Sequence, residues 1–107
     1  MGEDVALLAR IKELGQAYAA SLPGYVTRFQ TGVARLSHAR DVAELERERN
    51  GLREIAHKLA GSAGLYGFPE LSAWGKQTQK LCREAPVDAL DAAARTLAEL
   101  VGTPQRG

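Results

Sequence analysis

The sequence has little of several features that mark specialised classes of protein. It holds a single cysteine, Cys82, among 107 residues, which excludes an internal disulfide and any zinc site built from several cysteines. Lys and Arg total 14 against 13 Asp and Glu, so the chain lacks the strong positive charge that nucleic-acid and anionic-membrane binders carry. No apolar run approaches the ~20 residues that cross a bilayer, and the acidic start at Glu3 and Asp4 is unlike a secretory signal. We therefore expect a small cytoplasmic protein with neither nucleic-acid nor membrane partners.

Signals for β-strands are missing as well. Nowhere do β-branched and aromatic residues alternate over four or more positions, whereas apolar residues recur at the spacings of three and four that are typical of helices. A chain of this length supports one modest core. We therefore expect a single helical domain over 1–107, with its core at about 3–101 and a flexible tail at 102–107.

Prolines, glycines and capping residues mark the helix boundaries and predict five helices. Their ranges are about 3–20, 23–38, 41–67, 69–84 and 86–101. The break between the first two rests on Ser21 and Pro23, because serine can cap a helix and proline suits a first helical turn. Short connections favour antiparallel neighbours. The expected fold is therefore all-α, an up-and-down four-helix bundle with an additional N-terminal helix.

The limits of the third predicted helix leave two alternatives. Asp41 followed by Glu44 resembles a capping box, which places the helix start at 41. The Asn50-Gly51 pair is a turn signal inside this stretch, so it marks either a bend or a later start of the helix. We expect the continuous helix, ending at Gly67, because glycine is a good C-cap.

One face of this helix combines a histidine with small neighbours. A wheel of about 100° per residue gathers the apolar residues of 52–66 into one stripe: Leu52, Ile55, Ala56, Leu59, Ala63 and Tyr66. His57 lies about 140° from the centre of that stripe and should face solvent. Ala60, Gly61 and Gly64 follow on the side of the histidine. Either close helix contacts or clearance for a partner explains such small residues, and their direction away from the core favours clearance.

The chemistry of an exposed imidazole suits phosphoryl transfer. Such a ring is mostly neutral near neutral pH, and its free nitrogen can attack phosphorus. Phosphoryl transfer otherwise needs mainly alignment and charge neutralisation. Arg53 and Lys58 are near enough to His57 in sequence to help with the phosphoryl charge, although a role as simply solvated helix residues fits them equally well.

The segment Ala56–Leu71 resembles the signature of histidine-containing phosphotransfer (HPt) domains, which act in multistep two-component phosphorelays. Leucine, glycine and serine stand two, four and five residues after His57, and a further glycine stands ten residues after it. The resemblance implies a four-helix-bundle core with His57 as the exposed phosphoaccepting residue. It also implies that Gly61 leaves room for the phosphoryl group and the docking receiver domain.

The resemblance further implies a carrier without a kinase or nucleotide site of its own. The carrier would accept a phosphoryl group from the phospho-aspartate of one receiver and pass it to an aspartate of another. Receiver domains, and a hybrid histidine kinase as a further candidate, would be the partners, and Mg²⁺ would come from the receiver, so we expect no cofactor or metal here. We expect a monomer whose docking surface is edged by Leu65 or Phe68. Two departures stand out: Ala60 replaces the lysine of many members, and Gln79 is the closest match to their glutamate or glutamine in the following helix.

Other functions have weaker support in the sequence. A helical module that binds and inhibits a receiver or kinase without catalysis would leave the histidine dispensable. Glu54 and His57 have the Glu-x-x-His spacing of di-iron bundles, but there is no second pair. His38 is interpreted as a surface or C-cap residue, and Cys82 as a small, partly buried hydrophobe. Three aromatic residues could form a ligand box but more simply serve as core or docking rim: Tyr66, Phe68 and Trp74.

Overall fold

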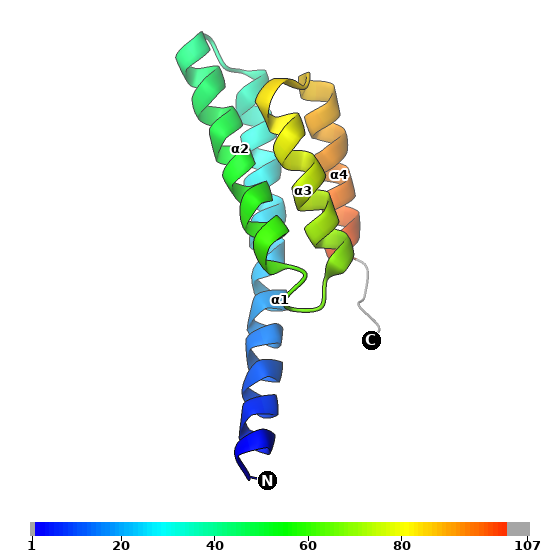
Figure 1. Ribbon diagram of the computed structural model, residues 1–107. Coiled ribbons are helices and arrows are strands. Elements are labelled where there is room, and N and C mark those ends of the chain that lie inside the picture. Colours follow the sequence, from blue (N-terminus) through cyan, green and yellow to red (C-terminus); the bar gives the residue numbers. More distant parts are fainter. Residues whose placement is uncertain (1, 103–107) are drawn as a thin grey trace.

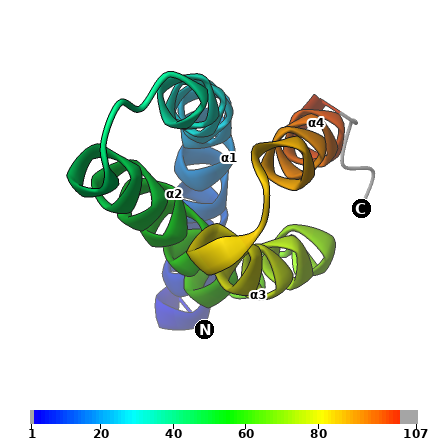
Figure 2. The same ribbon diagram turned by 90° about the horizontal axis from the view of Figure 1, so that it is seen from above.

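The computed structural model describes residues 2–102, which form four helices (Figure 1). In chain order these are α1 (Gly2–Ser37), α2 (Val42–Ser62), α3 (Pro69–Glu84) and α4 (Val87–Gly102). Each helix packs on two neighbours, so that α1, α2, α3 and α4 stand around a common core when viewed along the bundle (Figure 2). No strand occurs within residues 2–102. The expected all-α, up-and-down four-helix bundle is confirmed.

The prediction of an additional N-terminal helix was wrong, because the first two predicted helices form one continuous helix, α1. The side chains of α1 that pack inward keep one helical phase through Pro23: Tyr18, Leu22, Val26, Phe29, Val33 and Leu36. Leu22, which was placed in the predicted break, is buried. Pro23 removes the backbone hydrogen bond to the carbonyl of Ala19, but both residues lie on the exposed side of the helix. Water can reach that carbonyl, and burial of Leu22 favours a continuous helix.

The start of α2 follows the predicted capping box. The backbone N–H of Glu44 donates to Asp41 Oδ1 at 2.8 Å, and Glu44 Oε2 accepts from the backbone N–H of Arg40 at 2.9 Å. The helix then runs without interruption through Asn50 and Gly51, as expected. These two residues lie on its exposed side, where they disturb no packing.

The predicted end of this helix at Gly67 was wrong, since α2 ends at Ser62. Residues 63–67 form successive turns, and the N–H of Phe68 returns to the carbonyl of Ala63 at 2.8 Å. Gly67 has φ +90°, a conformation that favours glycine. Glycine therefore serves the reversal of the chain into α3 rather than the cap of α2.

The C-terminal half matches the expectation closely. The bounds of α3 are those predicted, and α4 lies within one residue of its predicted range. Trp74 of α3 packs edge-on against Phe29 with ring centroids 5.1 Å apart, and its Nε1 donates to the carbonyl of Ala93 at 2.9 Å. Trp74 is therefore a core residue. Gly102 closes α4, so it does not begin a tail, and residues 103–107 lie outside the described part of the chain.

The first turns of α1 extend well beyond the other three helices (Figure 1). The molecule is accordingly elongated, with principal extents of 59 × 24 × 19 Å. We call residues 4–17 of α1 the overhang. None of the helices described is both long and apolar enough to cross a membrane.

Candidate functional site

His57 lies on the exposed side of α2, as the helical wheel predicted. The opposite side of α2 is buried in the bundle through Leu52, Ala56 and Leu59. Further members of the predicted stripe follow the same pattern, because Ala63 is fully buried and Ile55 packs partly against the core. Burial of that stripe fixes the rotation of α2 and so presents the imidazole outward.

The imidazole has one side-chain partner, on α3. His57 Nδ1 lies 3.2 Å from Gln79 Oε1. An amide oxygen only accepts hydrogen bonds, so this contact holds the tautomer in which Nδ1 carries the proton and Nε2 has the free lone pair. The structure thus brings together His57 and Gln79, which the sequence had linked only through the resemblance.

Gly75 explains how α3 comes close enough for this contact, and the sequence analysis missed it. A Cβ on Gly75 would come within 2.6 Å of the Ala56 carbonyl oxygen and of the Ala60 backbone nitrogen. Ser72, one turn earlier in α3, donates from its hydroxyl to the Ala60 carbonyl at 2.8 Å. The only signal in the sequence was a glycine inside a predicted helix, which costs about 1 kcal/mol relative to alanine and so calls for a packing reason.

The three small residues beside His57 lie in three different environments. Gly61 is exposed, and a Cβ there would meet nothing within 4 Å. At Ala60 the backbone nitrogen and Cα lie against Gly75 of α3. Gly64 lies in the loop beyond the end of α2, where a Cβ would meet Ser72 Oγ at 3.6 Å. Open space is therefore observed at Gly61, whereas clearance for a partner at Ala60 and Gly64 stays a prediction.

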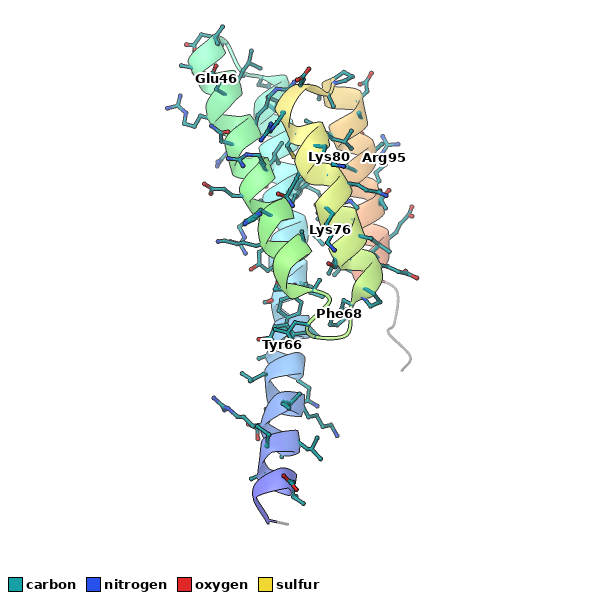
Figure 3. All side chains as sticks on the ribbon, in the orientation of Figure 1. Glu46, Tyr66, Phe68, Lys76, Lys80 and Arg95 are labelled. Atoms are coloured by element: carbon teal, nitrogen blue, oxygen red, sulfur yellow. The ribbon has the colours of Figure 1, made fainter. Side chains whose placement is uncertain are left out.

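A basic cleft lies between α2 and α3 on the side of Gln79. It has a volume of about 540 Å³, and its lining consists of Arg53, Lys76, Gln79, Lys80, Arg83 and Glu84. Figure 3 shows Lys76 and Lys80 on successive turns of α3. Four cationic groups against one carboxylate give the cleft a positive potential. Arg53 lines this cleft, whereas Lys58 is exposed and does not line it. A role for either residue in neutralising the phosphoryl charge stays a prediction.

The C-terminal end of α2, which follows His57, is held against α1 by a hydrogen bond and by ring stacking. Ser62 donates from its hydroxyl to the Lys58 carbonyl at 2.6 Å, and its Oγ lies 2.8 Å from the hydroxyl of Tyr18. The ring of Tyr66 stacks on that of Tyr18 with centroids 4.6 Å apart, and Phe68 lies at 5.9 Å from the same ring. Burial raises the pKa of the Tyr18 hydroxyl, and the hydrogen bond to Ser62 partly offsets that rise. Tyr66 and Phe68 thus close the base of the bundle beside α1 (Figure 3).

The remaining candidates are separated in space or occupied by structural contacts. His38 Nδ1 lies 2.9 Å from the Ala34 carbonyl, so this histidine satisfies the last turn of α1. Cys82 is buried, and burial raises the pKa of its thiol to about 11. Within residues 2–102 no three or more His, Cys, Asp or Glu side chains gather as a metal site would require. Leu65, proposed as a docking edge, is strongly exposed in the α2–α3 loop, whereas Phe68 is half-buried.

The chain matches a known protein family. The family model of the Hpt domain matches residues 7–103, which is nearly the whole chain. This chain belongs to the Hpt domain family. Hpt domains perform histidine-containing phosphotransfer in two-component phosphorelays, and they carry phosphoryl groups without a kinase site of their own. They interact with receiver domains and kinases.

The match and the fold agree for this Hpt domain, since the helical bundle lies within the matched residues. The comparisons with curated proteins and with solved structures gave no match.

Proposed function

We propose that this Hpt domain is a phosphorelay intermediate that carries the phosphoryl group on Nε2 of His57. It accepts the group from the phospho-aspartate of one receiver domain and passes it to an aspartate of another. The observation that carries the proposal is the contact between His57 Nδ1 and Gln79 Oε1, 3.2 Å long, on an otherwise exposed imidazole. This contact supports a ring that is both accessible and held in the tautomer with a nucleophilic Nε2.

The transfer needs no proton relay in this chain. The lone pair of Nε2 forms a bond to phosphorus while the bond from phosphorus to the aspartate oxygen breaks, and the carboxylate leaves with the electron pair. The ring then carries positive charge, with the proton still on Nδ1. Gln79 Oε1 accepts from that N–H, and a hydrogen bond from a charged donor is stronger than one from a neutral donor. Gln79 is thus proposed as a positioning residue that also stabilises the charged ring.

The surroundings of His57 support docking of a receiver. Gly61, one turn along α2, leaves open space beside the imidazole. The basic cleft lined by Arg53 and Lys80 lies on the α3 side, where it attracts an acidic partner surface and neutralises phosphoryl charge. Charges at the rim of such an interface act mainly on the association rate. We propose that any Mg²⁺ used in the transfer belongs to the receiver.

The test uses purified chain with a phosphorylated receiver domain carrying radiolabelled phosphate. We expect label to move to wild type, to be lost in acid, and to move on to a second, unphosphorylated receiver. His57→Gln should abolish this transfer while the fold is retained by circular dichroism. His38→Gln is the matched control, because His38 is also exposed and contacts only its own helix end.

Two results would contradict the proposal. Label that persists in His57→Gln would place the acceptor elsewhere. Binding of the receiver by wild type and His57→Gln with equal affinity, and with no label on either, would show a non-catalytic binding module instead.

A further inference from the structure

The overhang presents aliphatic side chains that nothing in the described chain covers. Along one side of it, Leu7 is 60% exposed, Leu8 66%, Ile11 54% and Leu14 41%. Ile11 follows Leu7 by four residues and Leu8 by three, and Leu14 follows Ile11 by three, so the four side chains share one side of the helix. We call these four residues the overhang stripe. An isolated helix of this length is marginally stable in water, so its apolar side needs burial to persist.

The overhang stripe continues the face by which α1 packs into its own bundle. From Leu14 the stripe passes to Tyr18 and then to the buried Leu22, in steps of four residues. Tyr18 is covered by the stacked ring of Tyr66, and there the α2–α3 loop closes the bundle. The overhang carries this face beyond the other three helices (Figure 1), and among the described residues nothing buries it there. The core-facing side of α1 is thus longer than the core that residues 2–102 provide.

We propose that the overhang stripe pairs with the overhang stripe of a second copy of this chain, in antiparallel orientation about an axis near Ile11. A parallel pair is blocked, because the second α1 would run into the α2–α3 loop where Tyr66 covers Tyr18. An antiparallel pair avoids this clash by directing the two bundles to opposite ends. It also separates the two Asp4 carboxylates, which lie on the stripe side of the helix and would face each other in a parallel pair.

The size of the surface predicts a reversible dimer. The overhang, residues 4–17 at about 1.5 Å each, gives an overlap of roughly 21 Å. Such an overlap is at the small end of specific interfaces, below about 1,200 Å² in total. We expect a dissociation constant between about 10 µM and 1 mM. The proposed dimer differs from the monomer expected from the sequence, and it would leave His57 available because the imidazole lies on the bundle and outside the overhang.

Sedimentation velocity across about 10 µM to 1 mM protein tests the pairing. Wild type should shift from monomer to dimer over this range. Ile11→Glu and Ile11→Lys should each remain monomeric, because each puts like charges together at the axis. An equimolar mixture of the two should dimerise again. Ala9→Glu is the matched control: Ala9 is also an exposed residue of α1 but lies about 160° around the helix from Ile11, so this variant should dimerise as wild type does.

Cysteine substitutions test the orientation. Oxidised Ile11→Cys should form a disulfide-linked dimer, since the two positions meet at the axis, whereas Asp4→Cys should not. The native Cys82 is buried and gives a low background. Ready cross-linking through Asp4→Cys would show a parallel pair and overturn the proposal.

Other outcomes would also overturn it. A wild type that stays monomeric at 1 mM has no such dimer, and a dimer insensitive to Ile11→Glu uses another surface. If wild type is monomeric and Ile11→Glu instead slows phosphoryl transfer, the overhang stripe is a receiver contact. His57→Gln should dimerise normally, so failure of the dimer and failure of the proposed function are distinguishable.

Discussion

Gly75 of α3 lies against the backbone of Ala60 in α2, where any side chain would collide. A Cβ on Gly75 would come within 2.6 Å of the Ala60 nitrogen and 2.9 Å of its Cα. Gln79 stands one turn further along α3, and His57 stands one turn earlier in α2. The close approach at Gly75 therefore sets the separation at which Gln79 reaches the imidazole at 3.2 Å.

Gly75→Ala should push α2 and α3 apart. Because the colliding atoms belong to backbone, we expect a loss of about 1–3 kcal/mol in the free energy of unfolding. Phosphoryl acceptance should also slow, since Gln79 moves away from His57. Urea denaturation and the transfer rate measure the two effects. The control is Gly61→Ala, which meets no atom within 4 Å and should gain up to about 1 kcal/mol from helix propensity. Unchanged stability in Gly75→Ala would contradict the close packing.

Gly61→Leu separates clearance from stability. A leucine at this exposed position should leave the bundle as stable as wild type or slightly more so. It should nevertheless reduce transfer from a phosphorylated receiver by at least about tenfold, which corresponds to about 1.4 kcal/mol of lost docking or alignment. Gly61→Ala, with a small side chain, is the intermediate case. A full transfer rate in Gly61→Leu would mean that no partner surface approaches this turn of α2.

Gln79→Leu tests the tautomer. Without the amide oxygen, Nδ1 loses its acceptor, and the ring should shift toward the tautomer protonated at Nε2. Transfer should slow roughly 2- to 12-fold, as expected for one net hydrogen bond of 0.5–1.5 kcal/mol. Nitrogen-15 NMR of the imidazole reads the tautomer directly, and Gln79→Glu, which keeps an acceptor, should retain it. An unchanged tautomer in Gln79→Leu would remove the positioning role.

Arg53→Ala tests the basic cleft. We expect transfer from the receiver to slow roughly 2- to 10-fold at low salt, through a slower association. The difference from wild type should shrink as salt rises, since ions screen exposed charges. Arg47→Ala is a matched control, because Arg47 is an exposed arginine of the same helix that does not line the cleft. Equal effects of the two substitutions would mean that net charge matters and the cleft does not.

Because Cys82 is buried, the free energy of unfolding should fall at alkaline pH. Burial raises the pKa of its thiol from 9.0 to about 11, so the folded state favours the neutral thiol. That contribution is fully present below pH 9 and is lost as the pH rises to about 11, by an amount on the order of 2–3 kcal/mol. The thiol should also resist alkylation at pH 8 until the chain unfolds. A free energy of unfolding that falls between pH 9 and 11 in wild type but equally in Cys82→Ala would contradict this account.

The position of His57 could be predicted because it depends on one helix alone. The apolar spacing of α2 sets which side is buried, and the capping box at Asp41 fixes where the helix begins. The break predicted at Pro23 of α1 was wrong because the outcome there depends on contacts between helices and not on one helix alone. A local preference for a break at Pro23 is outweighed by burial of Leu22 against other helices, and no single segment reveals that burial.

The role of the small residues could not be assigned from one helix either. Ala60 and Gly61 are adjacent in sequence and similar in size, yet one contacts Gly75 and the other faces open space. A helical wheel separates them by about 100°, but it does not show on which side α3 packs. The same limit hid Gly75, whose importance rests on the backbone of α2 opposite it.

The most direct test of the central claim is the position of the phosphoryl group on the imidazole. Wild type labelled with nitrogen-15 is phosphorylated by a receiver domain and observed by proton–nitrogen NMR. We expect a phosphoryl group on Nε2 of His57, with the proton retained on Nδ1 beside Gln79. A phosphoryl group on Nδ1, or on any other residue, would contradict it.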